Sequence, residues 1–285
     1  MKIASTLVDG NPKVVVAEGE DWLSIPNTGA FSALRSVRAL LEKWDSISVD
    51  QLRENSTVLS SQPKFLCPLT SPGKVICVGK NYAEHAQEMG GDAPETPVIF
   101  NKFASCLIGN GEPIEIPPIC ERVDYEAELV AVIGKSGRNI ACESALEHVF
   151  GYTIGNDVTA RDWQKGRPGG QWLLGKAIDT FGPLGPYIVT SDEIGDPQDL
   201  DIELQLNGET MQSSNTSQMI FSIDVLIAHV SKFFTLNPGD LIFTGTPAGV
   251  GAGRNPEVYL TDGDCVSITI EKIGTLTNSV ISGSR

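Results

Sequence analysis

Two glutamates separated by one residue, Glu126 and Glu128, stand at the head of an apolar run, residues 129–133. The run predicts a buried strand, on which residues i and i+2 face the same side about 6.6 Å apart. Adjacent carboxylates repel each other, and one pKa rises unless a cation or a proton lies between them. The alternative is an exposed face on an edge strand, which is common surface patterning.

A third carboxylate, Asp157, ends another predicted strand, residues 151–157. Three carboxylates with no histidine nearby make an all-oxygen donor set, which suits Mg²⁺, Mn²⁺ or Ca²⁺ better than Zn²⁺. Taken alone, Asp157 has a simpler alternative role as a helix N-cap.

His85 is one of three histidines, and Glu88 follows it by three residues in segment 81–89. On a helix these two side chains are neighbours on one face. A carboxylate beside an imidazole fixes its tautomer and makes it a better general base. A charged surface helix is the competing interpretation. The other histidines, His148 and His229, have apolar neighbours and are expected to be structural.

Lys176 lies in an apolar, glycine-containing segment, residues 170–177. A buried ammonium needs an anionic partner, which a carboxylate cluster or an anionic substrate would provide; a snorkelling surface lysine is the alternative. The glycine-rich segment 244–253 lacks the Gly-Lys-Ser/Thr ending of a P-loop and the G-x-G-x-x-G pattern, so a nucleotide site is not indicated. Backbone N–H groups that approach a carboxylate ligand remain an option for this loop.

Short apolar runs dominate the elements that must position these residues. Strands are predicted over 3–8, 13–17, 74–79, 98–103, 126–134, 151–157, 187–190, 201–206, 241–244 and 265–271, and helices over 30–44, 81–89, 143–150 and 217–234, with a short Ser-capped helix from residue 48. Strands and helices do not alternate regularly, which disfavours Rossmann and TIM-barrel topologies. We predict an α+β fold with a β-rich core and two domains, 1–70 and 71–285.

Charge and composition limit the partners of the chain. Its 285 residues include 36 acidic and 21 basic side chains, a net charge of −15, with no basic patch, so neither nucleic acid nor an anionic membrane is an expected target. No apolar run approaches the ~18 residues of a membrane span, and no signal peptide is indicated, so a cytoplasmic location is expected. The six cysteines form no C-x-x-C pair and are expected to be small core residues.

Five ordered motifs together resemble the fumarylacetoacetate hydrolase family over about residues 70–281. They are VGKNYAEHAQEM, DYEAEL, GNDVTARDWQ, GKAIDTFGPLGP and PGDLIFTGTPAGVG. The resemblance implies a mixed β roll, a homodimer, and a divalent cation, Mg²⁺ or Mn²⁺. It implies roles at positions that match the family's motifs: metal ligands Glu126, Glu128 and Asp157; a lysine beside the metal, Lys176; a dyad on a lid segment, His85 and Glu88; and substrate contacts Arg161, Gln164 and Thr246.

The activity implied by the resemblance is hydrolysis of a C–C bond in a 2,4-dioxo (acylpyruvate-type) acid. The His85–Glu88 dyad would take a proton from water, and the cation with Lys176 would stabilise the enolate that leaves. Decarboxylation or isomerisation of a related oxo or dienoic acid, or ureidoglycolate lysis, uses the same parts. A non-catalytic member with a structural metal is a further alternative, which the completeness of the site residues disfavours.

Overall fold

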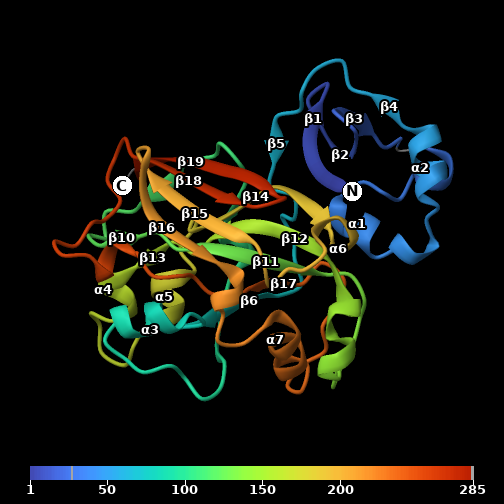
Figure 1. Cartoon of the computed structure of the whole chain (residues 1–285). Coiled ribbons are helices and arrows are strands. Elements are labelled where there is room, and N and C mark those ends of the chain that lie inside the picture. Colours follow the sequence, from blue (N-terminus) through green and yellow to red (C-terminus); the bar gives the residue numbers. More distant parts are fainter. Residues whose placement is uncertain (27, 284–285) are drawn as a thin grey trace.

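The computed structural model describes residues 1–26 and 28–283, so the last two residues of the predicted second domain lie outside it. Figure 1 shows a strand-rich body with a smaller N-terminal lobe beside it. The mixed, strand-rich architecture confirms the predicted α+β class.

A 12-stranded sheet forms the frame of the described part of the chain. Strand β5 (Phe65–Leu66) pairs with β1, and β8 (Leu107–Ile108) pairs with β14. The remaining strands lie in the spatial order β4 (Thr57–Val58), β3 (Asp21–Ser24), β2 (Asn11–Glu18), β1 (Lys2–Val8), β14 (Gly182–Thr190), β12 (Val149–Asn156), β11 (Ala127–Ile133), β17 (Leu241–Phe243), β6 (Val75–Gly79) and β7 (Val98–Lys102).

A second sheet of five strands packs on one face of this frame. Its order is β16 (Glu209–Asn215), β15 (Asp201–Leu206), β18 (Cys265–Ile270), β19 (Gly274–Ser282) and β9 (Ile114–Ile116). Leu129 and Ala131 of β11 join the core shared with this sheet, whereas Val130 and Val132 face a second core. Strand β11 is therefore buried on both faces, which explains its unbroken apolar run.

The N-terminal segment extends the large sheet, since β1 pairs with β14 through Lys2↔Val189 and Ile3↔Ile188. Its apolar side chains share the second core with strands β11 and β17. The domain boundary near residue 70 stays a prediction.

The helices are short. They are α1 (Val37–Leu41), α2 (Val49–Asn55), α3 (Ala83–Glu88), α4 (Arg161–Gln164), α5 (Trp172–Lys176), α6 (Ser191–Ile194) and α7 (Ile223–Val230). Single 3-10 turns are η1 (Gly29–Phe31), η2 (Trp44–Ser46), η3 (Ala104–Cys106), η5 (Thr216–Gln218) and η6 (Gly251–Gly253), and η4 (Cys142–His148) is longer. The pair β10 (Val123–Asp124) and β13 (Thr159–Ala160) stands apart from both sheets.

Three predicted helices are wrong in extent. Segment 30–44 breaks into η1 and α1. Ser36 is the N-cap of α1, and its side chain accepts a hydrogen bond from Ala39 N. Segment 143–150 is the 3-10 element η4, and its last two residues join β12. Segment 217–234 shortens to α7 because Asn81 accepts from the backbone N–H groups of Ile220 and Phe221, at 2.7 and 2.8 Å.

Four of the six cysteines are buried as expected, but Cys142 is half-buried and Cys265 is exposed, so the core prediction is wrong for these two. No helix in the described part of the chain combines the length and apolar character needed to cross a membrane.

Candidate active site

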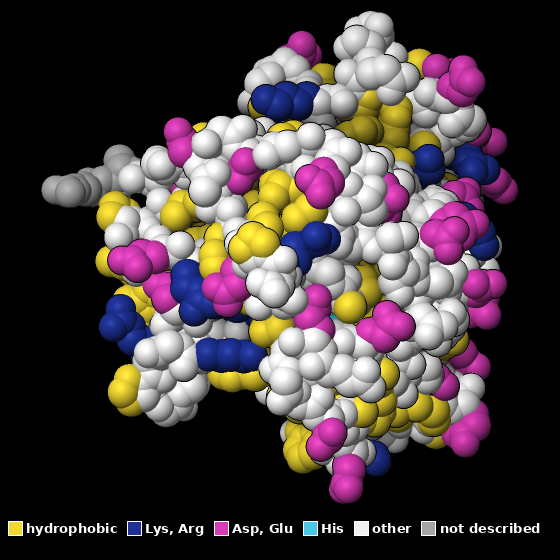
Figure 2. All heavy atoms as spheres, turned by 60° about the vertical axis from the view of Figure 1, so that its left-hand side comes forward, with side chains coloured by type: hydrophobic (Ala, Val, Ile, Leu, Met, Phe, Trp, Pro, Cys, Tyr) yellow, Lys and Arg dark blue, Asp and Glu magenta, His cyan; other side chains and the backbone are white. Residues whose placement is uncertain are grey.

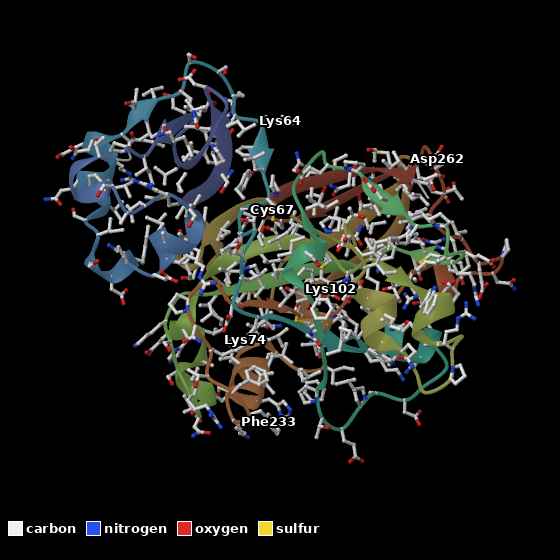
Figure 3. All side chains as sticks on the ribbon, turned by 180° about the vertical axis from the view of Figure 1, so that it is seen from behind. Lys64, Cys67, Lys74, Lys102, Phe233 and Asp262 are labelled. Carbon is white, nitrogen blue, oxygen red and sulfur yellow. The ribbon has the colours of Figure 1, made fainter. Side chains whose placement is uncertain are left out.

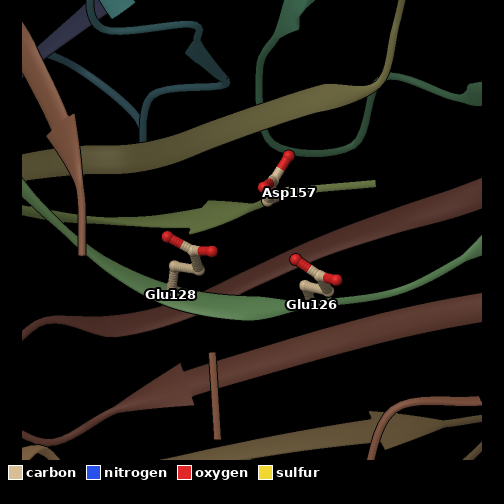
Figure 4. Close-up of side chains that lie close together, drawn as sticks. All are labelled: Glu126, Glu128 and Asp157. Carbon is tan, nitrogen blue, oxygen red and sulfur yellow. The ribbon is translucent and has the colours of Figure 1, made fainter. Parts of the chain in front are cut away.

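Three carboxylates meet where strands β11 and β12 end side by side. Glu126 precedes β11, Glu128 lies within it, and Asp157 follows β12. Asp157 N donates to Glu126 O at 2.9 Å, which places the two residues opposite each other. All three side chains are buried, and each offers an oxygen within 4.8 Å of the others. Figure 4 shows both glutamates projecting from the same side of the segment that leads into β11, as the spacing predicts, with Asp157 on the neighbouring segment.

Three buried cations surround this cluster. Lys176 Nζ lies 2.7 Å from both Glu126 Oε2 and Asp157 Oδ2. Lys102 Nζ lies 2.8 Å from Asp157 Oδ1, and Arg161 Nη2 lies 2.7 Å from Glu126 Oε1. The pKa of Lys176 is raised because the charges of Asp157 and Glu126 outweigh the effect of burial. Lys176 therefore has the anionic partners that its apolar context requires.

The three carboxylates do not share this compensation equally. Burial opposes ionisation of Glu126, but Lys176, Arg161 and His85 lower its pKa to about 2. Burial raises the pKa of Glu128, and the charges of Asp157 and Glu126 raise it further. Glu128 has no cationic side chain in contact among the described residues; its Oε2 accepts from Gly245 N at 2.8 Å. A divalent cation would remove this repulsion, so the all-oxygen donor set fits Mg²⁺ or Mn²⁺.

The His85–Glu88 pair forms as predicted on α3. His85 Nδ1 lies 3.2 Å from Glu88 Oε2, and the imidazole is buried. Glu88 Oε1 accepts from Gly249 N at 2.9 Å. One carboxylate oxygen of Glu88 therefore contacts the imidazole while the other is fixed by the backbone of the glycine-rich loop. Because His85 is buried, α3 is not the exposed charged helix of the alternative interpretation.

The glycine-rich loop 244–253 holds the protein's own carboxylates. Besides Gly245 to Glu128 and Gly249 to Glu88, the N–H groups of Gly251 and Ala252 donate to Asp124 at 2.7 and 3.0 Å. A Cβ on Gly249 would lie 2.1 Å from Met211 O, so this approach requires glycine. The loop's role as a ligand cradle is not supported at these four N–H groups, which already have acceptors.

One small cavity of about 30 Å³ brings the predicted residues together. It is lined by His85, Glu126, Glu128, Arg161, Gln164, Lys176 and Thr246, among others. Gln164 Oε1 accepts from Arg161 Nη1 at 3.0 Å, which leaves the amide N–H groups of Gln164 as donors. Thr246 Oγ1 accepts from Gln212 Nε2 at 2.8 Å, so its own proton is free to point elsewhere. Glu88 and Asp157 are not part of this lining, but they contact the lining residues His85 and Lys176, respectively.

Comparison with models of protein families shows the family to which this chain belongs. Residues 74–281 match the model of the fumarylacetoacetate hydrolase C-terminal domain. This chain belongs to the fumarylacetoacetate hydrolase family.

Named relatives in the family carry out more than one reaction. A mitochondrial oxaloacetate tautomerase of Xenopus laevis is 52% identical over 249 residues, which cover 86% of this chain and 78% of the relative. A fumarylacetoacetate hydrolase of Exiguobacterium antarcticum is 39% identical with a TM-score of 0.87, over 99% of this chain and 100% of that one. A 5-carboxymethyl-2-hydroxymuconate delta-isomerase of Mycobacterium smegmatis is 40% identical with a TM-score of 0.78, over the full length of both. The family is thus shown, while the reaction differs among its members.

Three residues of the site are absent from the sequence prediction. Lys102 ends the apolar strand β7, and the same argument that selected Lys176 could have selected it. Asp124 opens the DYEAEL motif and accepts from Arg161 Nε at 2.8 Å. Gln212, which positions Thr246, lies in β16 with no local signal, because its partners are 34 and 85 residues away.

Proposed function

We propose that this chain is an enzyme that interconverts the keto and enol forms of a 2-oxo acid. The observation that carries the proposal is the cavity that the His85 imidazole shares with Glu126, Glu128 and Lys176. A base beside a site that stabilises negative charge on oxygen is what enolisation requires. The name of the Xenopus relative supports oxaloacetate as the first substrate to test.

Each residue has a role that follows from its contacts. A divalent cation held by Glu126, Glu128 and Asp157 would supply Lewis-acid stabilisation of the negative charge on the substrate oxygens. His85, oriented by Glu88, takes a proton from the carbon next to the 2-oxo group, and the enolate oxygen is protonated to give the enol. In the reverse direction the enol oxygen loses its proton and His85 delivers a proton to the carbon. Two of the three N–H groups of the Lys176 ammonium bind carboxylates, which leaves one for a substrate oxygen.

Gln164 and Thr246 complete the set of donors, since each lines the cavity with an N–H or O–H group that donates to no residue in 1–26 or 28–283. Arg161 is committed to Asp124, Glu126 and Gln164, so its role is to position Gln164 and to compensate Glu126. The direct substrate contact expected for Arg161 stays a prediction.

A second candidate is hydrolysis of the C–C bond of an acylpyruvate-type acid. The same imidazole could take a proton from water, and the leaving group would again be an enolate that the same donors stabilise. The solved hydrolase relative supports this reaction. Isomerisation of a dienoic acid is favoured by the name of the solved delta-isomerase of Mycobacterium smegmatis. Decarboxylation and ureidoglycolate lysis stay predictions.

The test compares the two candidates with Mg²⁺, with Mn²⁺ and with EDTA. Enol loss from freshly dissolved enol-oxaloacetate is followed by ultraviolet absorbance, and pyruvate release from an acylpyruvate is followed in parallel. We expect metal-dependent enol loss that His85→Ala lowers in kcat, with His229→Ala as the matched control outside the site. Metal-dependent pyruvate release without enol loss would favour the second candidate, and neither activity would overturn both.

The assembly and the cellular location remain predictions. A homodimer is expected, and sedimentation or light scattering of the purified chain tests it. The Xenopus relative is named as mitochondrial, and the cytoplasmic location proposed for this chain is open to cell fractionation. A small oxo acid as partner, with no nucleic acid or membrane, is part of the same proposal.

A further inference from the structure

The lining of the active-site cavity has an apolar part that the proposed function does not use. Its apolar side chains are those of Val78, Met89, Phe100 and Trp172. Figure 2 turns the side of the molecule that carries α3, α4 and α5 toward the viewer, and apolar side chains lie exposed there beside basic ones. The cavity offers only about 30 Å³ to small groups, so the position of each wall decides which substrates fit.

Trp172, the first residue of α5, is held in place by two neighbours. Its ring makes an edge-to-face contact with Phe100, with the ring centroids 5.3 Å apart and an angle of 65° between the ring planes. A Cβ on Gly79 would lie 2.9 Å from Trp172 Cζ3, so the indole packs directly on the end of β6 and a side chain at position 79 would displace it. Because movement of the indole would break both contacts, it forms a rigid part of the wall.

Phe100 connects this wall to the group that binds the reacting end of the substrate. Lys176 Nζ lies over the Phe100 ring, 5.1 Å from its centroid. The proposed function assigns the remaining N–H group of Lys176 to a substrate oxygen. The indole of Trp172 is therefore separated from that ammonium by a single aromatic ring.

We infer that Trp172 is a specificity-determining residue, whose ring limits the length of the substituent on the carbon that loses the proton. This inference rests on the proposed function for the reacting end of the substrate. A short substituent ends before the indole, whereas a longer one meets a side chain that Gly79 and Phe100 hold in place. The preferred substrate is therefore a short-chain 2-oxo acid.

Equilibrium binding tests the wall without turnover. 2-Hydroxybutanoate and 2-hydroxy-4-phenylbutanoate differ only in a phenyl group at the end of the substituent, and calorimetry measures the affinity of each in the presence of Mg²⁺. One methylene group in a hydrophobic pocket already changes specificity about 10- to 200-fold. We therefore expect the unmodified chain to bind the phenyl compound at least about tenfold more weakly than the short acid.

Variants at position 172 attribute this difference to the indole. Trp172→Ala should remove most of the difference between the two acids, and Trp172→Phe, which keeps a smaller ring beside Phe100, should remove only part of it. Leu174→Ala changes an exposed residue of the same helix outside the cavity lining and should leave both affinities unchanged.

Thermal unfolding tests whether the indole is held against Gly79. Gly79→Ala should lower the melting temperature of the unmodified chain, because the new methyl group displaces the ring. In the Trp172→Ala background the same substitution should cost less, since the ring is gone. Equal costs in the two backgrounds would refute the rigid wall.

A kinetic measurement then separates this inference from the proposed function. In deuterated water, loss of the NMR signal of the protons next to the 2-oxo group reports enolisation of 2-oxobutanoate and of 2-oxo-4-phenylbutanoate. Trp172→Ala should raise the ratio of kcat/KM for the phenyl acid to that for the short acid at least about tenfold. Discrimination in binding that Trp172→Ala abolishes, without enolisation of either oxo acid, would retain the wall and reject the keto–enol reaction. Equal affinities of the unmodified chain for the two hydroxy acids, no binding of either, or a difference that Trp172→Ala leaves intact would overturn the role of Trp172.

Discussion

Lys102 connects the segments that carry the active-site residues, and its replacement by methionine is the strongest structural test of the site. Its ammonium contacts Asp157 Oδ1 at 2.8 Å and donates to the carbonyls of Val158, Lys176 and Phe181. Figure 3 shows Lys102 in the middle of the large body. Methionine has a similar length, so the substitution removes the charge and the donors with little change in volume.

The contacts of Lys102 set the expected loss of stability. Removing one partner of a buried ion pair costs about 3–5 kcal/mol. Each of the three carbonyls left without its donor costs about 1–3 kcal/mol. Because members of one network are not additive and Asp157 keeps Lys176, we expect a total loss of about 4–6 kcal/mol. A folded chain has only about 5–15 kcal/mol of stability, so Lys102→Met should be marginal.

Urea denaturation followed by tryptophan fluorescence measures this loss, with Lys43→Met as the control for the same substitution at an exposed position. The control should change the free energy of unfolding by about 0.5 kcal/mol or less. In Lys102→Met the carboxylate cluster loses a compensating charge, so added Mn²⁺ should recover more stability than in the unmodified chain. A loss below about 1 kcal/mol, or no difference in the response to Mn²⁺, would refute the connecting role of Lys102.

Three further predictions concern the metal, the dyad and the donor set. Because the pKa of Glu128 is raised, a bound cation competes with a proton at this carboxylate, and metal affinity should fall with decreasing pH. Calorimetry in buffers of different ionisation enthalpy should detect the released proton, and Glu128→Gln should abolish this release. Gly253→Ala would place a Cβ 2.2 Å from Glu88 Cδ and displace the Glu88 side chain. We expect kcat to fall at least about tenfold while the melting temperature stays nearly unchanged. An unchanged kcat would count against the role of the His85–Glu88 dyad. Gln212→Ala frees the Thr246 hydroxyl to rotate, and KM should rise about threefold to tenfold; an unaltered KM would remove Thr246 from the substrate contacts.

Low pH offers an independent check on the ion pairs around Glu126. The pKa of this carboxyl is about 2 in the folded chain and is depressed from an ordinary value of 4.5. A depressed carboxylate pKa adds stability that is fully present above the unfolded value and is lost as pH falls through the folded value. The contribution should therefore disappear between about pH 4.5 and 2, and Glu126→Gln should flatten the stability profile in that interval.

Local spacing predicted the parts of the site that one segment supplies. Glu126 and Glu128 share a face because strand geometry fixes residues i and i+2, and His85 meets Glu88 because helix geometry fixes i and i+3. The strands β6, β11 and β12, which are rich in apolar residues, were predicted close to their observed bounds. By contrast, β14 begins at Gly182, well before its predicted start at residue 187, and β16 and β19 were not predicted.

The failures come from contacts between distant segments. Asn81 accepts hydrogen bonds from the backbone N–H groups of Ile220 and Phe221, although Phe221 is 140 residues away in the sequence. These contacts shorten a helix whose apolar spacing is regular. Lys102 and Gln212 belong to the site only because the fold brings them to Asp157 and Thr246. Periodicity within one segment carries no information about such partners.

The glycine-rich loop 244–253 has a consequence for redesign of the enzyme. Because it supports Glu88, Asp124 and Glu128 at once, a change in its backbone would displace the partner of His85 and the carboxylate cluster together. Two groups that share one support cannot be adjusted separately by exchanging that support. Libraries aimed at new substrates should therefore leave residues 244–253 unchanged.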